Sequence, residues 1–233
     1  MNINQLFDRE SYTYTYLLFD YNRQAIIIDP VLEQFDRDVS IIDSFGLNLH
    51  FIIETHVHAD HITSASMLKN KFAAQIAYGS QSQVEGADLL LEDGQEINVG
   101  NINLKTIHTP GHTKGCVSLY SPEGYVFTGD TLFIKGAGRT DFQGGSTQSS
   151  YDSIKHKLYA LPNETIVYPA HDYKGLTSST IGQEKQWNDS VNETTQLEDY
   201  IKREEQKDRP YPKKFDSAVP ANSYCGDQSK IIS

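Results

Sequence analysis

The sequence has no long hydrophobic run and almost no cysteine. No apolar stretch in its 233 residues approaches the roughly 20 that span a bilayer, so we expect no transmembrane segment and no membrane partner. Residues 1–10 lack the pattern of a signal or transit peptide. The two cysteines, Cys116 and Cys225, are too few for a disulfide framework and favour a reducing compartment, although a single bridge stays an alternative. These absences predict a cytoplasmic protein.

Basic residues are also scarce. Twenty Lys and Arg stand against 31 Asp and Glu, which gives a formal charge of −11. Nucleic acids and anionic membranes attract proteins through clustered Lys and Arg, so this composition disfavours both as partners. An anionic substrate would have to be bound by a few placed cations. The length suits one sizeable domain that buries its own core.

Hydrophobic periodicity predicts alternating strands and helices. Residues 12–19 and 25–28 form an opening hairpin, and apolar residues at three- and four-residue steps predict a helix over 32–45. Strands and helices then alternate through two successive halves, which predicts an α/β fold with helices covering the sheets. We expect one domain over 1–182 and a short helical and extended C-terminal segment, 183–233, packed on the same domain. The other expected elements are strands at 49–53, 75–78, 102–107, 117–120, 125–127 and 165–168, helices at 64–72, 151–161 and 194–205, and a proline-containing tail.

The strongest chemical signal is the segment Thr55-His-Val-His-Ala-Asp-His61, directly after a predicted buried strand. It contains His56, His58, Asp60 and His61. Neutral imidazole and carboxylate groups bind divalent transition metals, and a strand end holds them rigidly. One such histidine alone would more often be structural, but the cluster favours a metal site.

Three more potential ligands follow later predicted strands. They are His112 in Thr109-Pro-Gly-His-Thr113, Asp130 in Thr128-Gly-Asp-Thr131 and His171 in Pro169-Ala-His-Asp172. Each is weak evidence alone, because Gly-Asp and Gly-His turns are common. Their order and setting make the combination specific.

This motif series resembles that of the metallo-β-lactamase superfamily, T-H-x-H-x-D-H, then G-H-T, then G-D-T, then a last His. The resemblance spans about residues 6–175 and implies an αββα sandwich with the metal site where the loops converge. For the two-metal hydrolases of the superfamily it implies one metal at His56, His58 and His112, a second at Asp60, His61 and His171, and Asp130 as the bridge.

Finer motifs at 129–143, 168–177 and 218–226 look like the persulfide dioxygenase branch. Glyoxalase II, the nearest hydrolytic relative, carries a longer helical C-terminal domain than the roughly 50 residues after Gly182. The branch resemblance implies a single Fe(II) at His56, His112 and Asp130, a ligand set that suits non-haem iron oxygenases. It leaves His58, Asp60, His61 and His171 to orient ligands, carry protons or form an alternative second metal site.

The implied reaction converts glutathione persulfide, O₂ and water to sulfite and glutathione. Arg139 and Tyr173 match positions that contact glutathione in glyoxalase II, and a guanidinium can hold a carboxylate through two hydrogen bonds. The alternatives are that Arg139 pairs structurally with Asp141 and that Tyr173 only packs. Relatives also lead us to expect a homodimer.

Two other functions stay open at this stage. A zinc-dependent glutathione thioester hydrolase would use two metals without O₂, and a metal-stabilised binding domain would show no turnover. The chain also reads Asn188-Asp-Ser190 where relatives of the branch tend to have Asn-Pro-Arg. That departure leaves open how the C-terminal helix docks and whether another persulfide, such as coenzyme A persulfide, is preferred.

Overall fold

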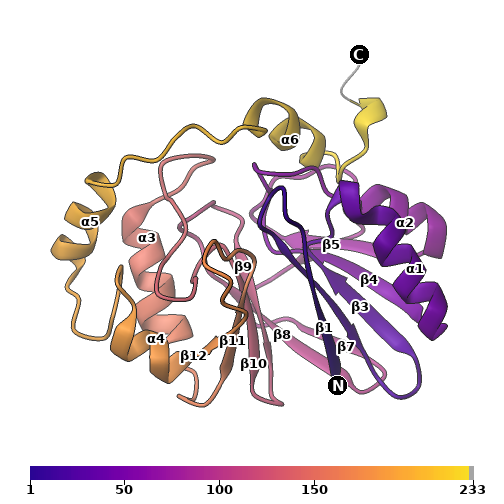
Figure 1. Cartoon of the computed structure of the whole chain (residues 1–233), viewed down its shortest axis with the longest axis horizontal. Coiled ribbons are helices and arrows are strands. Elements are labelled where there is room, and N and C mark those ends of the chain that lie inside the picture. The colour runs from indigo at the N-terminus through magenta and orange to yellow at the C-terminus, as the bar shows by residue number, and fades with distance from the viewer. Residues whose placement is uncertain (231–233) are drawn as a thin grey trace.

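The computed structural model describes residues 1–230 and consists of two six-stranded sheets that face each other (Figure 1). The first sheet contains β1 (Asn2–Phe7), β2 (Tyr14–Phe19), β3 (Gln24–Ile28), β4 (Asn48–Glu54), β5 (Gln75–Gly79) and β6 (Leu89–Leu91), in that order. The second has the order β12-β11-β10-β9-β8-β7, with β7 (Glu96–Val99), β8 (Ile102–His108), β9 (Val117–Ser121), β10 (Tyr125–Gly129), β11 (Ile166–Pro169) and β12 (Ser179–Thr180).

Helices cover the outer faces of both sheets (Figure 1). On the first sheet lie η1 (Leu32–Gln34), α1 (Phe35–Phe45) and α2 (Ala65–Phe72). On the second lie α3 (Thr147–Asp152), its π-helical continuation η2 (Ser153–Leu158), α4 (Ile181–Trp187) and α5 (Leu197–Glu205). The chain then crosses the loop end of both sheets to α6 (Phe215–Asn222) and η3 (Gln228–Lys230). None of the helices in residues 1–230 is long and apolar enough to cross a membrane.

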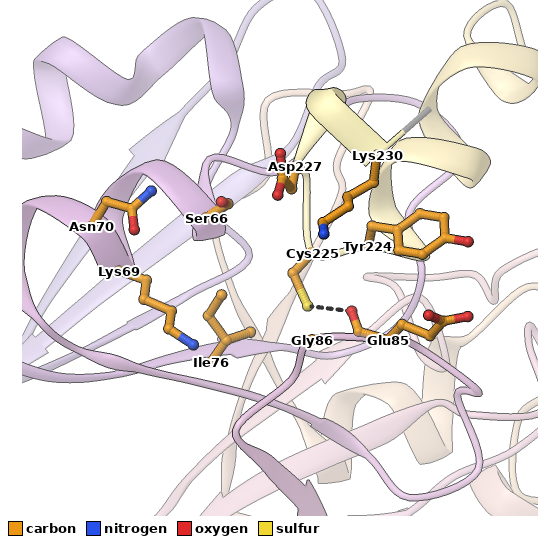
Figure 2. Close-up of a pocket in the computed structure, with 10 residues that line it drawn as sticks. All are labelled: Ser66, Lys69, Asn70, Ile76, Glu85, Gly86, Tyr224, Cys225, Asp227 and Lys230. Atoms are coloured by element: carbon orange, nitrogen blue, oxygen red, sulfur yellow. Dashed lines mark hydrogen bonds between the residues drawn. The ribbon is translucent and has the colours of Figure 1, made fainter. Parts of the chain in front are cut away.

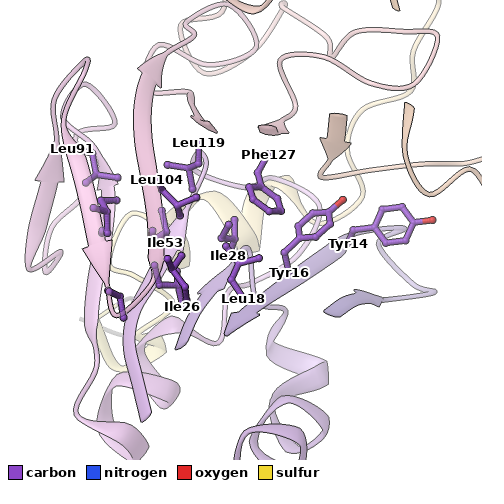
Figure 3. Packing of buried hydrophobic residues seen from close by; sticks show 14 residues of the cluster. Tyr14, Tyr16, Leu18, Ile26, Ile28, Ile53, Leu91, Leu104, Leu119 and Phe127 are labelled. Carbon is purple, nitrogen blue, oxygen red and sulfur yellow. The ribbon is translucent and has the colours of Figure 1, made fainter. Parts of the chain in front are cut away.

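The core follows from the alternation of side chains along the strands. Tyr16, Leu18 and Ile28 point between the sheets, where they pack with Leu119 and Phe127 of the second sheet (Figure 3). Alternate residues of a strand face opposite sides, so the neighbours of these residues pack under α1 and α2 instead. The expected αββα sandwich is therefore confirmed.

Several elements differ in extent from the sequence prediction. Strand β1 was not anticipated, and the helix expected at 194–205 begins only at Leu197 because the side chain of Asn192 accepts hydrogen bonds from the N–H groups of Thr194 and Thr195. The expected proline-containing tail includes α6, a helix that accommodates Pro220. Residues 231–233, the end of the predicted C-terminal segment, lie outside the described residues.

The topology brings the polar motifs to one edge. His56 follows β4, and His112, Asp130 and His171 follow β8, β10 and β11. Strands β8, β10 and β11 run in the same direction, since β9 is antiparallel to both β8 and β10 while β11 is parallel to β10. Their carboxyl ends therefore meet at one edge, beside the loop that leaves the first sheet.

Asp38 on α1 provides a test of how this helix packs on the first sheet. The carboxyl is fully buried, and burial raises its pKa to about 6 despite the adjacent Arg37. Because the folded-state pKa exceeds the unfolded value, ionising Asp38 destabilises the fold as pH rises from about 4 to 6. We expect Asp38→Asn to raise the free energy of unfolding at pH 8 by about 2 kcal/mol and to have little effect near pH 4.

Urea unfolding at both pH values measures this difference. Asp36→Asn, at an exposed position of the same helix, is the matched control and should change stability by less than about 0.5 kcal/mol. Equal effects of the two substitutions at pH 8 would contradict the prediction.

Candidate metal centre

The loop that carries the first histidines is fixed at its start by a buried carboxylate. Asp29 accepts hydrogen bonds from Thr55 N at 2.7 Å and from Thr55 Oγ1 at 2.8 Å. Since the hydroxyl hydrogen goes to Asp29, Thr55 Oγ1 accepts from Nδ1–H of His56 at 3.0 Å. The lone pair of His56 is then on Nε2, where it can bind a metal.

The close approach of the second sheet to this loop requires a glycine. Gly129, at the end of β10, has φ +52°, and a Cβ there would lie 2.6 Å from Thr55 Oγ1. Only glycine allows the next residue, Asp130, to come this near to His56 without displacing Thr55.

His56, His112 and Asp130 bring three ligand atoms together within 4.8 Å of one another. Asp130 Oδ2 lies 3.5 Å from His112 Nε2 and 3.9 Å from His56 Nε2. His112 donates its Nδ1 hydrogen to the carbonyl of Arg139 at 2.7 Å, which leaves its Nε2 free for a metal. His56 Nε2 and Asp130 Oδ1 are buried and have no hydrogen-bond partner in the described residues. Two imidazoles and one carboxylate with unpaired atoms fit a divalent transition metal.

The electrostatics keep one of these ligands neutral. Burial, together with the neighbouring His58 and His112, lowers the pKa of His56 well below its usual value. The ring is therefore an unprotonated ligand at neutral pH, the form that binds metals.

A second group lies on the other side of Asp130. His171 Nε2 is 3.5 Å from Asp130 Oδ1 and 3.6 Å from Asp60 Oδ2, and its Nδ1–H donates to the carbonyl of Tyr12 at 3.2 Å. Burial would raise the pKa of Asp60, but the charges of His61 and His171 outweigh it and lower that pKa well below the usual range. Asp60, His171 and His58 have ligand atoms within 4.8 Å of one another.

His61 is not a member of that group, although the sequence interpretation placed it with Asp60 and His171. Its Nδ1 lies 2.9 Å from Asp60 Oδ2, and the same oxygen accepts a hydrogen bond from Thr13 at 3.0 Å. His61 therefore holds Asp60 in place within the described structure.

His58 also faces two carboxylates that the sequence analysis did not single out. Its Nε2 lies 3.1 Å from Asp29 Oδ1 and 3.4 Å from Glu54 Oε2, and all three residues are buried. Burial alone would lower the pKa of His58, but the carboxylates of Asp29, Asp60 and Glu54 outweigh it and raise that pKa well above normal. The only sequence signal for Asp29 and Glu54 was an acidic residue at the end of an apolar strand.

A cavity of about 570 Å³ opens over both groups, and Arg139 and Tyr173 line it. The guanidinium of Arg139 donates to both oxygens of Asp141, at 2.7 and 2.8 Å, and to the carbonyl of Pro210 at 2.8 Å. Arg139 therefore forms the ion pair with Asp141 that the sequence analysis gave as the alternative to binding glutathione. Tyr173 is 65% exposed, and its ring stacks on His171 with 6.0 Å between centroids.

A residue far along the chain secures the ligand loop. Asn222, fully buried at the end of α6, donates to the carbonyls of His58 at 2.9 Å and His61 at 2.8 Å and accepts from Thr63 N at 2.9 Å. Its place in the motif at 218–226 was the only sequence signal for it. The C-terminal segment thus fixes the loop that carries the histidines.

The two cysteines are free and buried. Cys225 donates from Sγ to the carbonyl of Glu85 at 3.4 Å, at the wall of a separate cavity of about 370 Å³ (Figure 2). Burial raises the pKa of both thiols to about 12. Neither thiol is ionised at neutral pH, and both act as small buried side chains.

The unusual Asn188-Asp-Ser190 segment forms an ordered turn. Asn188 Oδ1 accepts from the N–H groups of Ser190 and Val191, and its Nδ2 donates to the carbonyl of Gly136 at 3.0 Å. This turn docks the end of α4 against the loop that precedes Arg139.

An αββα sandwich with a buried His-His-carboxylate set at its loop edge defines a class of metal-dependent enzymes. A family model described as "Metallo-beta-lactamase superfamily" matches residues 8–171. The chain is 42% identical to relatives from Bos taurus and Homo sapiens named "Persulfide dioxygenase ETHE1, mitochondrial", over 97% of this chain and 89% of each relative. The crystal structure of ETHE1 from Myxococcus xanthus superposes with a TM-score of 0.93 at 44% identity, covering 97% of this chain and all of that one.

The chain therefore belongs to the metallo-β-lactamase superfamily and, within it, to the persulfide dioxygenase branch. A hydroxyacylglutathione hydrolase from Photorhabdus laumondii is 36% identical, over 69% of this chain and 62% of its own length.

The hydrogen bonds between Asn222 and the ligand loop yield a second prediction. We expect Asn222→Ala to lower the free energy of unfolding by about 2–4 kcal/mol, because it leaves two buried carbonyls and one N–H without partners. Metal content after dialysis should fall as the loop loosens.

Asn103→Ala, at an exposed position of β8, is the control and should change neither quantity. Urea unfolding and elemental analysis provide the measurements. If Asn222→Ala kept the stability and the metal content of the wild type, the proposed role of Asn222 in fixing the ligand loop would be contradicted.

Proposed function

We propose that this chain is a dioxygenase that converts glutathione persulfide, O₂ and water to sulfite, glutathione and two protons at one Fe(II) held by His56, His112 and Asp130. The observation that carries the proposal is the convergence of their three ligand atoms beneath the open cavity, where His56 Nε2 has no hydrogen-bond partner among residues 1–230. The relatives named persulfide dioxygenase support the reaction class.

When bound, Fe(II) supplies the electrons that activate O₂ next to the persulfide sulfur, a role that redox-inert zinc cannot fill. The side chains present the ligand atoms in fixed tautomers. Thr55 holds the Nδ1–H of His56, and the carbonyl of Arg139 holds that of His112. Both metal-facing nitrogens are therefore set before substrate arrives.

Asp60 and His171 line the cavity 3.6 Å apart and form an ion pair, because the pKa of Asp60 is lowered and that of His171, despite burial, is raised by the carboxylates of Asp130 and Asp60. The two protons released with sulfite therefore pass to solvent water rather than to this pair. The aromatic rings of Tyr12 and Tyr173, with 5.4 Å between centroids, line the same cavity.

One observation favours the alternative, a zinc-dependent hydrolase of glutathione thioesters. His58, Asp60 and His171 could hold the second metal that such an enzyme requires. The hydrolase relatives, however, match a smaller share of this chain than the dioxygenase relatives do. The dioxygenase is therefore the better-supported function.

We further propose that residues 183–233 belong to the same domain as 1–182, since the bonds of Asn222 and Pro210 tie the two parts together. Action in the cytoplasm, a homodimer and the absence of nucleic-acid and membrane partners stay predictions from the sequence. The mammalian relatives carry the word "mitochondrial" in their names.

The test combines metal analysis with O₂ uptake. Protein expressed with iron and purified anaerobically should contain about one iron per chain and form sulfite as O₂ disappears. His112→Ala removes a ligand and should lower both metal content and sulfite formation at least tenfold. His156→Ala, at an exposed site, is the control. About two zinc ions per chain and no O₂ uptake would contradict the dioxygenase and favour the hydrolase.

A further inference from the structure

The outer wall of the cavity is a connecting segment, residues 209–214, which we call the strap. It lies between α5 and α6 and crosses the loop end of the molecule (Figure 1). Arg139 donates to the carbonyl of Pro210 at 2.8 Å, and the ring of Tyr211 packs 5.6 Å from that of Phe142. Arg139 also lies over the Phe142 ring, 4.4 Å from its centroid. These contacts give the strap a defined place over the cavity.

Four basic side chains line this cavity, and three already have carboxylate partners. Arg139 is paired through two hydrogen bonds with Asp141. Lys214 lies 2.7 Å from Glu33 and 2.9 Å from Glu10. The third, Arg209, lies 2.8 Å from the buried carboxylate of Glu204.

The fourth, Lys213, is exposed and has no hydrogen bond or ion pair within residues 1–230. A carboxylate that bound to Arg139, Arg209 or Lys214 would meet a charge that a carboxylate of the protein already neutralises. At Lys213 it would meet a positive charge that has no carboxylate partner within residues 1–230. Lys213 is therefore the position in this wall where an anionic group gains most.

We propose that Lys213 binds a carboxylate of the substrate, and that Arg139 is a positioning residue that holds the strap over the site. This inference rests on the proposed function, because it concerns a substrate with carboxylates, as glutathione persulfide has. It defines the preferred substrate class as persulfides with an anionic group remote from the reacting sulfur. Persulfides of neutral thiols would gain nothing from Lys213.

Binding of glutathione itself tests the proposal without any turnover. Calorimetric titration of the metal-loaded chain should give a Kd about tenfold higher for Lys213→Gln than for wild type, as expected for the loss of one charged hydrogen bond at an exposed site. Lys213→Arg keeps the charge and should restore binding. Lys202→Gln, at an exposed position of α5 outside the cavity, should bind as wild type does.

Kinetics separate recognition of charge from a structural effect on the wall. With glutathione persulfide, Lys213→Gln should raise KM about tenfold and leave kcat within about twofold, because the interaction is lost equally from ground and transition states. With the persulfide of 2-mercaptoethanol, which has no charged group remote from its sulfur, the KM values of the variant and wild type should agree. The wild-type KM for glutathione persulfide should rise with salt more steeply than that of the variant.

Unchanged glutathione binding in Lys213→Gln would overturn the proposal, and so would an equal rise in KM for the persulfide of 2-mercaptoethanol. If Lys213→Gln bound glutathione more weakly but the wild type oxidised no persulfide, Lys213 would be supported as the carboxylate site. Only the proposed dioxygenase function would then be contradicted.

Discussion

The hold of Asp29 on Thr55 is the interaction on which the rest of the site depends. Through two hydrogen bonds it fixes the start of the ligand loop, and through Thr55 it sets the tautomer of His56. Asp29 also lies 3.1 Å from His58. A buried carboxylate is costly unless it is paired, and Asp29 is paired by three polar groups: the N–H and hydroxyl of Thr55 and the imidazole of His58. These hydrogen bonds fix Thr55, and Thr55 in turn fixes the position of the metal-facing nitrogen of His56.

The C-terminal segment completes the centre from the opposite side. Asn222 holds the carbonyls of His58 and His61, while the bond between Arg139 and Pro210 secures the strap over the cavity. Arg139 links the two parts, because its own carbonyl accepts the hydrogen of His112. A substitution that moves the strap can therefore disturb a residue that faces the metal, although no strap residue belongs to the proposed ligand set.

Much of the site could be read from the sequence because the information is local. Histidines and aspartates directly after apolar strands, with glycine beside Asp130, identify residues that the structure does bring to one edge. The resemblance alone could not assign each nitrogen. For the two-metal hydrolases it grouped His61 with Asp60 and His171, which stays a prediction, and the side-chain geometry brings His58 to these two residues and places His61 Nδ1 beside Asp60. Ring orientation depends on neighbours such as Thr13 and Asp29, which are distant in sequence.

Strand periodicity and strand-end motifs, which are encoded within a few residues, determined the α/β alternation and the candidate ligands, and the resemblance that those motifs carry implied the αββα class and the branch of the superfamily. The partners of those ligands were decided only by the tertiary structure. Arg139 is a candidate for a carboxylate in the sequence, but folding brings Asp141 and Pro210 to its guanidinium and leaves Lys213 without a partner among the described residues. Whether a basic side chain is paired within the protein or remains able to bind a ligand depends on contacts between residues far apart in the sequence, and no local sequence pattern predicts these contacts.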